Sequence, residues 1–165
     1  MTGDSASASV FVAVAPDVAF EVFTNEIDLW WRTGVRFRIA GKRRGQLALE
    51  PRLGGRLFET FEVATGSHTF DVGRVTAWDP PAGLDLEWRA SNFAPDEKTF
   101  VTVRFEPANG GTRVTVRHSG WSALRADHPV RHGQATAAFL RTMGLWWGDL
   151  LTSLRLHVAE RLEGS

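Results

Sequence analysis

The stretch that decides the fold is ATAAFLRTMGLWWGDLLTSLRLHVAERL, which runs from Ala135 to Leu162. Its apolar residues recur in steps of three and four, at Ala135, Phe139, Met143, Trp146, Trp147, Leu150, Leu154, Val158 and Leu162. This spacing places one apolar stripe along an α-helix. At ~1.5 Å per residue the helix would be ~40 Å long, enough to cross a sheet. The sequence therefore predicts one long C-terminal helix that needs an apolar surface to cover.

The chain from Val35 to Ser119 predicts that surface as a sheet. Apolar and polar residues alternate there between turn residues, which is typical of strands with one wet and one dry face. The Asn109-Gly110-Gly111 turn tolerates positive φ and indicates a hairpin, so we expect antiparallel order. The predicted strands are Phe37 to Ile39, Gln46 to Glu50, Arg56 to Val63, His68 to Trp78, Leu84 to Arg89, Lys98 to Glu106 and Thr112 to His118.

The N-terminal part predicts a strand followed by two short helices. Ser7 to Val14 is rich in β-branched and aromatic residues, and Pro16 to Thr24 has helical spacing behind an N-terminal proline. Glu26 to Trp31 predicts the second helix, and Gly120 to Gly133 is interpreted as a loop. The expected fold class is α+β. A curved antiparallel sheet of six to seven strands surrounds the long C-terminal helix, which is a helix-grip architecture.

Length and composition predict one ordinary globular domain covering residues 1–165, with residues 1–6 as a disordered tail. Nineteen Lys and Arg balance nineteen Asp and Glu, so no overall positive field favours nucleic acid or an anionic membrane. The chain has no cysteine, which excludes disulfides, thiolate nucleophiles and cysteine-ligated metals. Its start lacks the features of an export signal or a membrane anchor, so we expect a cytoplasmic protein without membrane insertion.

Several stretches in order resemble one known family. These are VAPDVAFEVFT (14–24), EIDLWWRTG (26–34), LEPRLGGRLFETF (49–61), GRVTAWDPPAGLDLEW (73–88), VTVRFEPANGGTRVTVRHSGW (101–121) and WWGDLLTSL (146–154). The chain resembles the START-like (SRPBCC) superfamily, whose fold is also that of the birch-pollen allergen. Within it, the chain is similar to the family related to the activator of heat-shock protein 90 ATPase. The resemblance covers nearly everything from Val10 to Leu162.

The resemblance implies a fold but leaves several functions open, because one fold hosts many activities. Members of the family include ligand carriers, cyclase-like or hydrolase-like enzymes and chaperone co-activators. The eukaryotic co-chaperone carries a separate chaperone-binding domain in front of this one. This sequence shows no such domain, so a chaperone partner is a secondary expectation.

The aromatic composition predicts an apolar cavity between sheet and helix. The chain has seven Trp and eleven Phe but no Tyr, and concave apolar gaps are where small molecules bind. The alternative for each of these residues is ordinary core packing. We expect Trp30 and Trp31 at the cavity rim and Trp121 at an entrance. The predicted ligand-binding residues are Trp30, Trp31, Phe58, Phe70, Trp88, Phe100, His118, Trp121, Met143, Trp146 and Trp147.

Two polar residues are candidates for catalysis if the protein is an enzyme. His118 shares the apolar face of the last strand with Val114 and Val116, so it is either a satisfied core residue or a proton-transfer group. Glu59 is the second candidate. For Glu59, Asp71 and Arg74 the alternatives are a solvated face or a role in orienting a ligand. Hydrolase-elbow, Walker and dinucleotide motifs are missing from the sequence.

No cofactor or metal is predicted. His128 and His132 are four residues apart beside Asp127, but Pro129 interrupts them and a third histidine is lacking. The basic run at 42–44 is interpreted as a solvated turn. The sequence favours a binding protein for a small hydrophobic or amphipathic molecule over an enzyme, and it leaves open a homodimer through a strand edge or the Trp30-Trp31 rim.

Overall fold

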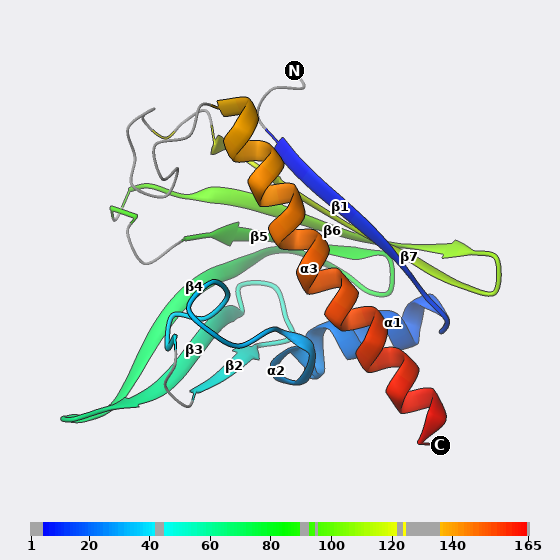
Figure 1. Ribbon diagram of the computed structural model, residues 1–165, viewed down its shortest axis with the longest axis horizontal. Coiled ribbons are helices and arrows are strands. Elements are labelled where there is room, and N and C mark those ends of the chain that lie inside the picture. Colours follow the sequence, from blue (N-terminus) through cyan, green and yellow to red (C-terminus); the bar gives the residue numbers. More distant parts are fainter. Residues whose placement is uncertain are drawn as a thin grey trace.

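The computed structural model describes residues 5–41, 45–89, 93–94, 96–121, 124 and 136–164 (Figure 1). Its helices and strands agree with the expected order of elements. They are β1 (Ser5–Val12), α1 (Pro16–Asn25), α2 (Ile27–Trp30), β2 (Gly45–Leu49), β3 (Arg56–Val63), β4 (Gly66–Asp79), β5 (Gly83–Trp88), β6 (Thr99–Ala108), β7 (Gly111–Ser119) and α3 (Thr136–Glu163).

The described strands form one seven-stranded sheet in the order β1-β7-β6-β5-β4-β3-β2, and every neighbouring pair is antiparallel. Alternation along each strand separates a core face from a solvent face. Val101 and Val103 of β6 and Val116 of β7 are all buried on the core face. The predicted fold class is therefore confirmed.

Helix α3 lies diagonally across the core face of the sheet, alongside β1 (Figure 1). Its apolar stripe is the part that the sheet covers, since Trp147, Leu150, Leu154 and Val158 are each at most 1% exposed. The short helices α1 and α2 pack against the same core, into which they bury Phe20, Phe23 and Trp30. Among the described residues, none of the helices combines the length and the hydropathy needed to cross a bilayer.

Two sequence predictions differ from the structure. The segment from Phe37 to Ile39 is a turn and not a strand, because its backbone bonds locally: the amides of Phe37 and Arg38 both donate to Gly34 O, at 3.1 and 3.0 Å. Residues 5 and 6, which were expected in a disordered tail, belong to β1, which begins at Ser5. Ser5 and Ala6 pair there with Ser119 and His118 of β7.

Candidate functional site

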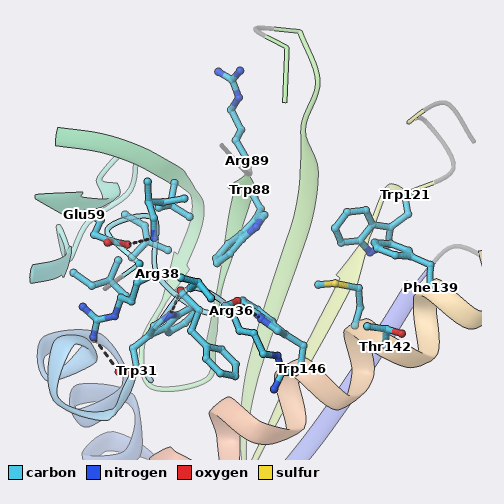
Figure 2. A pocket seen from close by; sticks show the side chains of 18 residues that line it. Trp31, Arg36, Arg38, Glu59, Trp88, Arg89, Trp121, Phe139, Thr142 and Trp146 are labelled. Atoms are coloured by element: carbon cyan, nitrogen blue, oxygen red, sulfur yellow. Dashed lines mark hydrogen bonds between the residues drawn. The ribbon is translucent and has the colours of Figure 1, made fainter. Parts of the chain in front are cut away.

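A cavity of about 690 Å³ lies between the core face of the sheet, the 31–41 segment and α3 (Figure 2). Most of its lining is apolar. The lining residues are Trp31, Val35, Arg36, Phe37, Arg38, Ile39, Gly41, Leu47, Leu57, Glu59, Val72, Trp88, Arg89, Trp121, Phe139, Thr142, Met143 and Trp146. A volume of this size is typical of small-molecule sites.

Aromatic rings build the walls of this cavity. Trp31, at the end of α2, stacks on Trp88 of β5 with ring centroids 5.9 Å apart and an interplanar angle of 27°. Trp146 of α3 meets both of these rings edge to face, at 5.9 and 6.3 Å. On the α3 side, Trp121 packs against Phe139 at 4.9 Å. Such offset and edge-to-face contacts fix the rings and present flat apolar surfaces to an occupant.

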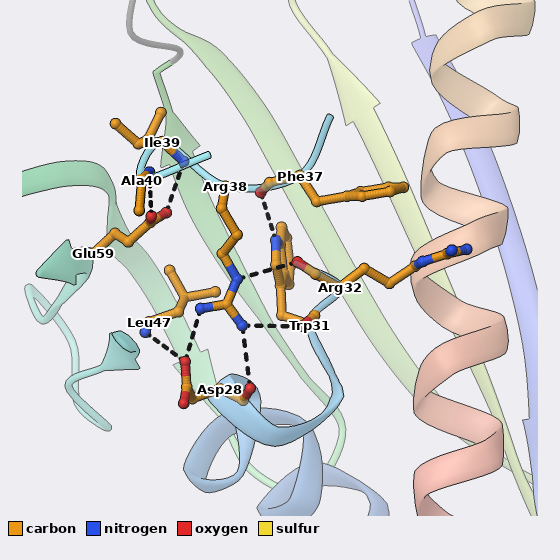
Figure 3. A network of polar contacts seen from close by, with 9 residues as sticks. All are labelled: Asp28, Trp31, Arg32, Phe37, Arg38, Ile39, Ala40, Leu47 and Glu59. Carbon is orange, nitrogen blue, oxygen red and sulfur yellow. Dashed lines mark hydrogen bonds and ion pairs between the residues drawn. The ribbon is translucent and has the colours of Figure 1, made fainter. Parts of the chain in front are cut away.

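Arg38 holds one wall of the cavity in place (Figure 3). Arg38 is only 8% exposed. Its guanidinium donates to the Asp28 carboxylate at 2.8 Å and to the carbonyl oxygens of Asp28, Trp31 and Arg32 at 3.1, 2.9 and 3.1 Å. The same Asp28 oxygen accepts from the amide of Leu47 at 2.8 Å. The planar guanidinium has several N–H donors and can make all of these bonds at once. They connect α2, the 31–41 segment and β2.

Glu59 fixes the same wall from the sheet. Glu59 is 1% exposed, and its carboxylate accepts hydrogen bonds from the amides of Ile39 and Ala40, at 2.9 and 2.6 Å (Figure 3). The solvated-face interpretation of Glu59 is therefore wrong. The burial of Glu59 could have been predicted from the strand pattern, since Glu59 alternates in phase with Leu57 and Phe61, which are both buried.

Two indole N–H groups bond to backbone carbonyls of the 31–41 segment, one from within the segment and one from α3. Trp31 Nε1 donates to Phe37 O at 2.9 Å, and Trp146 Nε1 donates to Arg36 O at 2.7 Å. The Phe37 ring also stacks on Trp146 at 5.6 Å. This segment was not predicted as a cavity wall, because the pattern of Phe37 to Ile39 is typical of a strand.

His118 is enclosed in the core next to the cavity but does not line it. Both ring nitrogens are engaged: Nδ1 lies 3.1 Å from Trp147 Nε1, and Nε2 lies 2.7 Å from Thr99 Oγ1. Burial lowers the pKa of His118 to about 3. The imidazole is neutral at pH 7 and fully bonded, so it is a satisfied core residue. The structure thus contradicts its placement as a proton-transfer group in the cavity.

Five of the predicted ligand-binding residues do line the cavity: Trp31, Trp88, Trp121, Met143 and Trp146. The adjacent indoles of α3 differ, since Trp147 is buried against the sheet and Trp146 lines the cavity. Trp121 is 2% exposed and does not stand at an entrance.

The remaining candidates lie elsewhere for reasons of strand and helix geometry. Trp30 is 1% exposed in the core, where its Nε1 donates to Phe23 O. Phe58 and Phe100 alternate with buried neighbours and so lie on the outer face of the sheet, where Phe100 is 44% exposed. Phe70 borders a separate hollow with Arg89 and Phe93.

Two glycines, Gly144 and Gly148, lie within helix α3 on either side of the two indoles. A Cβ on Gly148 would meet nothing within 4 Å, and one on Gly144 would only reach Ser7 O at an ordinary 3.6 Å. Neither residue lines the cavity. The structure therefore gives no packing reason for glycine at these positions.

The other polar candidates contribute little to the cavity. Asp71 and Arg74 are exposed, as a solvated face predicts. Asp127, His128 and His132, and the basic run at 42–44, lie outside the described residues. Within the described ranges, no three side chains of His, Cys, Asp or Glu come together as a metal site.

A curved antiparallel sheet closed by a long helix over an aromatic cavity defines a START-like, helix-grip protein. The model of the family described as Activator of Hsp90 ATPase homolog 1-like protein matches residues 13–143. The chain therefore belongs to this family. No curated protein matches the sequence at a significant level.

Solved structures with the same fold include three from different sources. Txn09, an anthrahydroquino-γ-pyrone synthase complexed with a molecule designated SUM, is 28% identical with a TM-score of 0.58, covering 96% of this chain and 99% of that one. PFC0360w, an HSP90 activator from Plasmodium falciparum, is 18% identical with a TM-score of 0.62 over 94% and 96%. SA2116 from Staphylococcus aureus, of unknown function, is 12% identical with a TM-score of 0.66 over 98% and 96%.

Proposed function

We propose that the protein binds a small, mainly apolar molecule in the cavity between the sheet and α3. The observation that carries this proposal is the volume of about 690 Å³ surrounded by Trp31, Trp88, Trp121 and Trp146. Burying apolar ligand surface is worth ~25 cal/mol per Å², so contact with these rings gives micromolar binding with few hydrogen bonds.

The polar groups around the cavity support an apolar occupant. Arg38 is satisfied by Asp28 and by three carbonyl oxygens, and the Glu59 carboxylate by two backbone amides. Arg36, at the same wall, pairs with Asp149 at 3.5 Å. Arg89, the remaining charged residue of the lining, donates to Ala94 O at 2.7 Å. These contacts engage the charged groups within the protein, which supports a mainly apolar occupant.

A filled-cavity variant tests the proposal. Met143→Trp puts a larger side chain into the lining, whereas Leu145→Trp makes the same kind of change two residues away at a position that is 72% exposed. The uncharged fluorescent probe N-phenyl-1-naphthylamine should bind the wild type and Leu145→Trp with micromolar affinity. Binding to Met143→Trp should be at least about tenfold weaker. Equal binding to all three proteins would refute the cavity as the site.

An enzyme that closes or hydrolyses rings is the second candidate function. It is favoured by the 28% identity to the anthrahydroquino-γ-pyrone synthase and by the buried Glu59 carboxylate in the lining. Glu59 would act as the base, and its hydrogen-bonded oxygens would have to be reached by the substrate. Turnover of a linear poly-ketone substrate that Glu59→Gln abolishes, without loss of probe binding, would establish this activity.

A chaperone partner is the remaining candidate, favoured by the family itself and by the similarity to the HSP90 activator. The test is the ATPase rate of purified Hsp90 with and without the protein. A rate that rises in proportion to the added protein until saturation supports this role, and an unchanged rate at micromolar concentrations excludes it.

A further inference from the structure

We infer that the ligand of this cavity carries a neutral oxygen acceptor, such as the carbonyl of a planar aromatic ketone, and that the indole N–H of Trp88 binds it. This inference rests on the proposed function and specifies the chemical class of its ligand. It follows from the hydrogen bonds of the tryptophans, from the fixed orientation of Trp88 and from the charge of the lining.

The neighbouring indoles already use their N–H groups within the protein. Trp31 and Trp146 donate to backbone carbonyls in the cavity wall, and Trp147 donates to His118. Trp88 Nε1 donates to no described residue, and it is not among the polar atoms that the protein seals off completely. Trp88 lines the cavity, and we infer that an occupant reaches its unsealed Nε1.

The position of Trp88 is fixed before any ligand arrives. Its ring stacks on Trp31 and meets Trp146, Trp147 and His118 edge to face, at 6.3, 5.6 and 5.7 Å. Its carbonyl oxygen accepts from Thr99 Oγ1 at 3.3 Å. Figure 2 shows the Trp88 side chain in the middle of the lining, between Glu59 and Trp121. A donor held in this way loses little entropy on binding.

The lining favours an uncharged acceptor and a flat skeleton. The buried Glu59 carboxylate borders the same cavity, so an anionic ligand would meet a like charge in a poorly solvated site. The three arginines of the lining have partners within the protein. Arg38 is bonded to Asp28, Arg36 pairs with Asp149 at 3.5 Å, and Arg89 donates to Ala94 O at 2.7 Å. Flat rings fit against the flat faces of Trp31 and Trp88, which indicates a planar aromatic ketone.

Fluorenone and fluorene test the inference, because they share one planar skeleton and differ by a carbonyl in place of a CH₂. Each displaces N-phenyl-1-naphthylamine from the protein, which gives its affinity. The wild type should prefer fluorenone by about three- to tenfold, the usual net effect of one hydrogen bond. Trp88→Phe keeps a flat ring but removes the N–H, so the preference should vanish. Trp78→Phe is the control, and it should retain the preference because Trp78 packs against Phe20 and does not line the cavity.

The outcomes separate this inference from the proposed function. If both compounds bind and the wild type shows no preference, or if Trp88→Phe retains it, the inference is wrong and the binding function stands. If neither compound nor the reporter binds, both are wrong. An independent readout is the ¹H–¹⁵N signal of the Trp88 indole in the wild type, which is assigned by its loss in Trp88→Phe. Fluorenone should move this signal downfield, and fluorene should not.

Discussion

Trp147 of α3 and His118 of β7 are joined by a hydrogen bond of 3.1 Å inside the core. An indole nitrogen can only donate, so His118 Nδ1 is the acceptor and the imidazole proton is on Nε2. This proton points to Thr99 Oγ1 at 2.7 Å, and the Thr99 hydroxyl donates in turn to Trp88 O. The chain of bonds links the long helix to three strands and fixes the tautomer of His118.

The first prediction concerns acid stability. Burial lowers the pKa of folded His118 to about 3, below the ordinary value of 6.5, so only the unfolded chain takes up its proton between these pH values. The free energy of unfolding should therefore be unaffected by His118 above pH 6.5. It should fall by up to about 1.4 kcal/mol per pH unit as the pH drops from 6.5 toward 3. Urea unfolding of wild type and His118→Gln measures the difference in slope.

Carboxylates elsewhere also titrate in acid, so the comparison with His118→Gln is the deciding control. Equal slopes in the two proteins would contradict the prediction. So would a His118 ring signal that titrates near pH 6.5 in the folded protein by NMR.

The second prediction concerns the wall held by Glu59. Glu59→Gln replaces one acceptor oxygen by an NH₂ group that faces a backbone amide of the 39–40 pair. We expect a loss of about 1–3 kcal/mol in unfolding free energy and faster hydrogen exchange at Ile39 and Ala40. Glu62→Gln, on the same strand but exposed, is the matched control and should change stability by less than about 0.5 kcal/mol. Unchanged exchange at Ile39 and Ala40 would count against this role of Glu59.

The third prediction concerns the Arg38 fork. Lysine keeps the positive charge of Arg38 but cannot reach the Asp28 carboxylate and three carbonyl oxygens together. Arg38→Lys should lower the unfolding free energy by about 1–3 kcal/mol and weaken probe binding, because the wall loosens. Arg117→Lys, at an exposed position of β7, should leave both quantities unchanged. Wild-type stability of Arg38→Lys in urea would show that charge alone is enough.

The fourth prediction contrasts two glycines. A Cβ on Gly148 would meet nothing within 4 Å, so Gly148→Ala should stabilise α3 by about 1 kcal/mol. A Cβ on Gly73 of β4 would lie 2.3 Å from Glu87 O of the neighbouring strand, so Gly73→Ala should be strongly destabilising. Thermal unfolding should show a rise of several degrees for the first variant and a fall for the second. A fall for Gly148→Ala would reveal a requirement for glycine that packing does not explain.

Periodicity made most of the fold predictable. The strand Arg56 to Val63 has the predicted bounds, and α3 is shifted by only one residue at each end. Both elements bury one regular face, and a regular face leaves a regular pattern in the sequence. The 31–41 segment leaves no such pattern, because its backbone turns and is held by side chains from Arg38, Glu59 and Trp146.

The candidate site was predictable only in part. Aromatic abundance indicated the cavity and five of its residues, whereas the positions of Trp30 and Trp147 depend on how α2 and α3 are rotated against the sheet. The outward position of Phe100 could have been inferred, since Phe100 alternates with Val101 and Val103. The two bonds of His118 join residues 19 and 29 positions away, which no local pattern encodes.

The 31–41 segment borders the cavity but contributes no strand to the sheet. Substitutions in its exposed residues therefore leave the strand register and the long helix intact while they alter the shape of the space beside Trp88. Protein engineering can therefore use this stretch to reset the dimensions of the cavity while the framework stays in place.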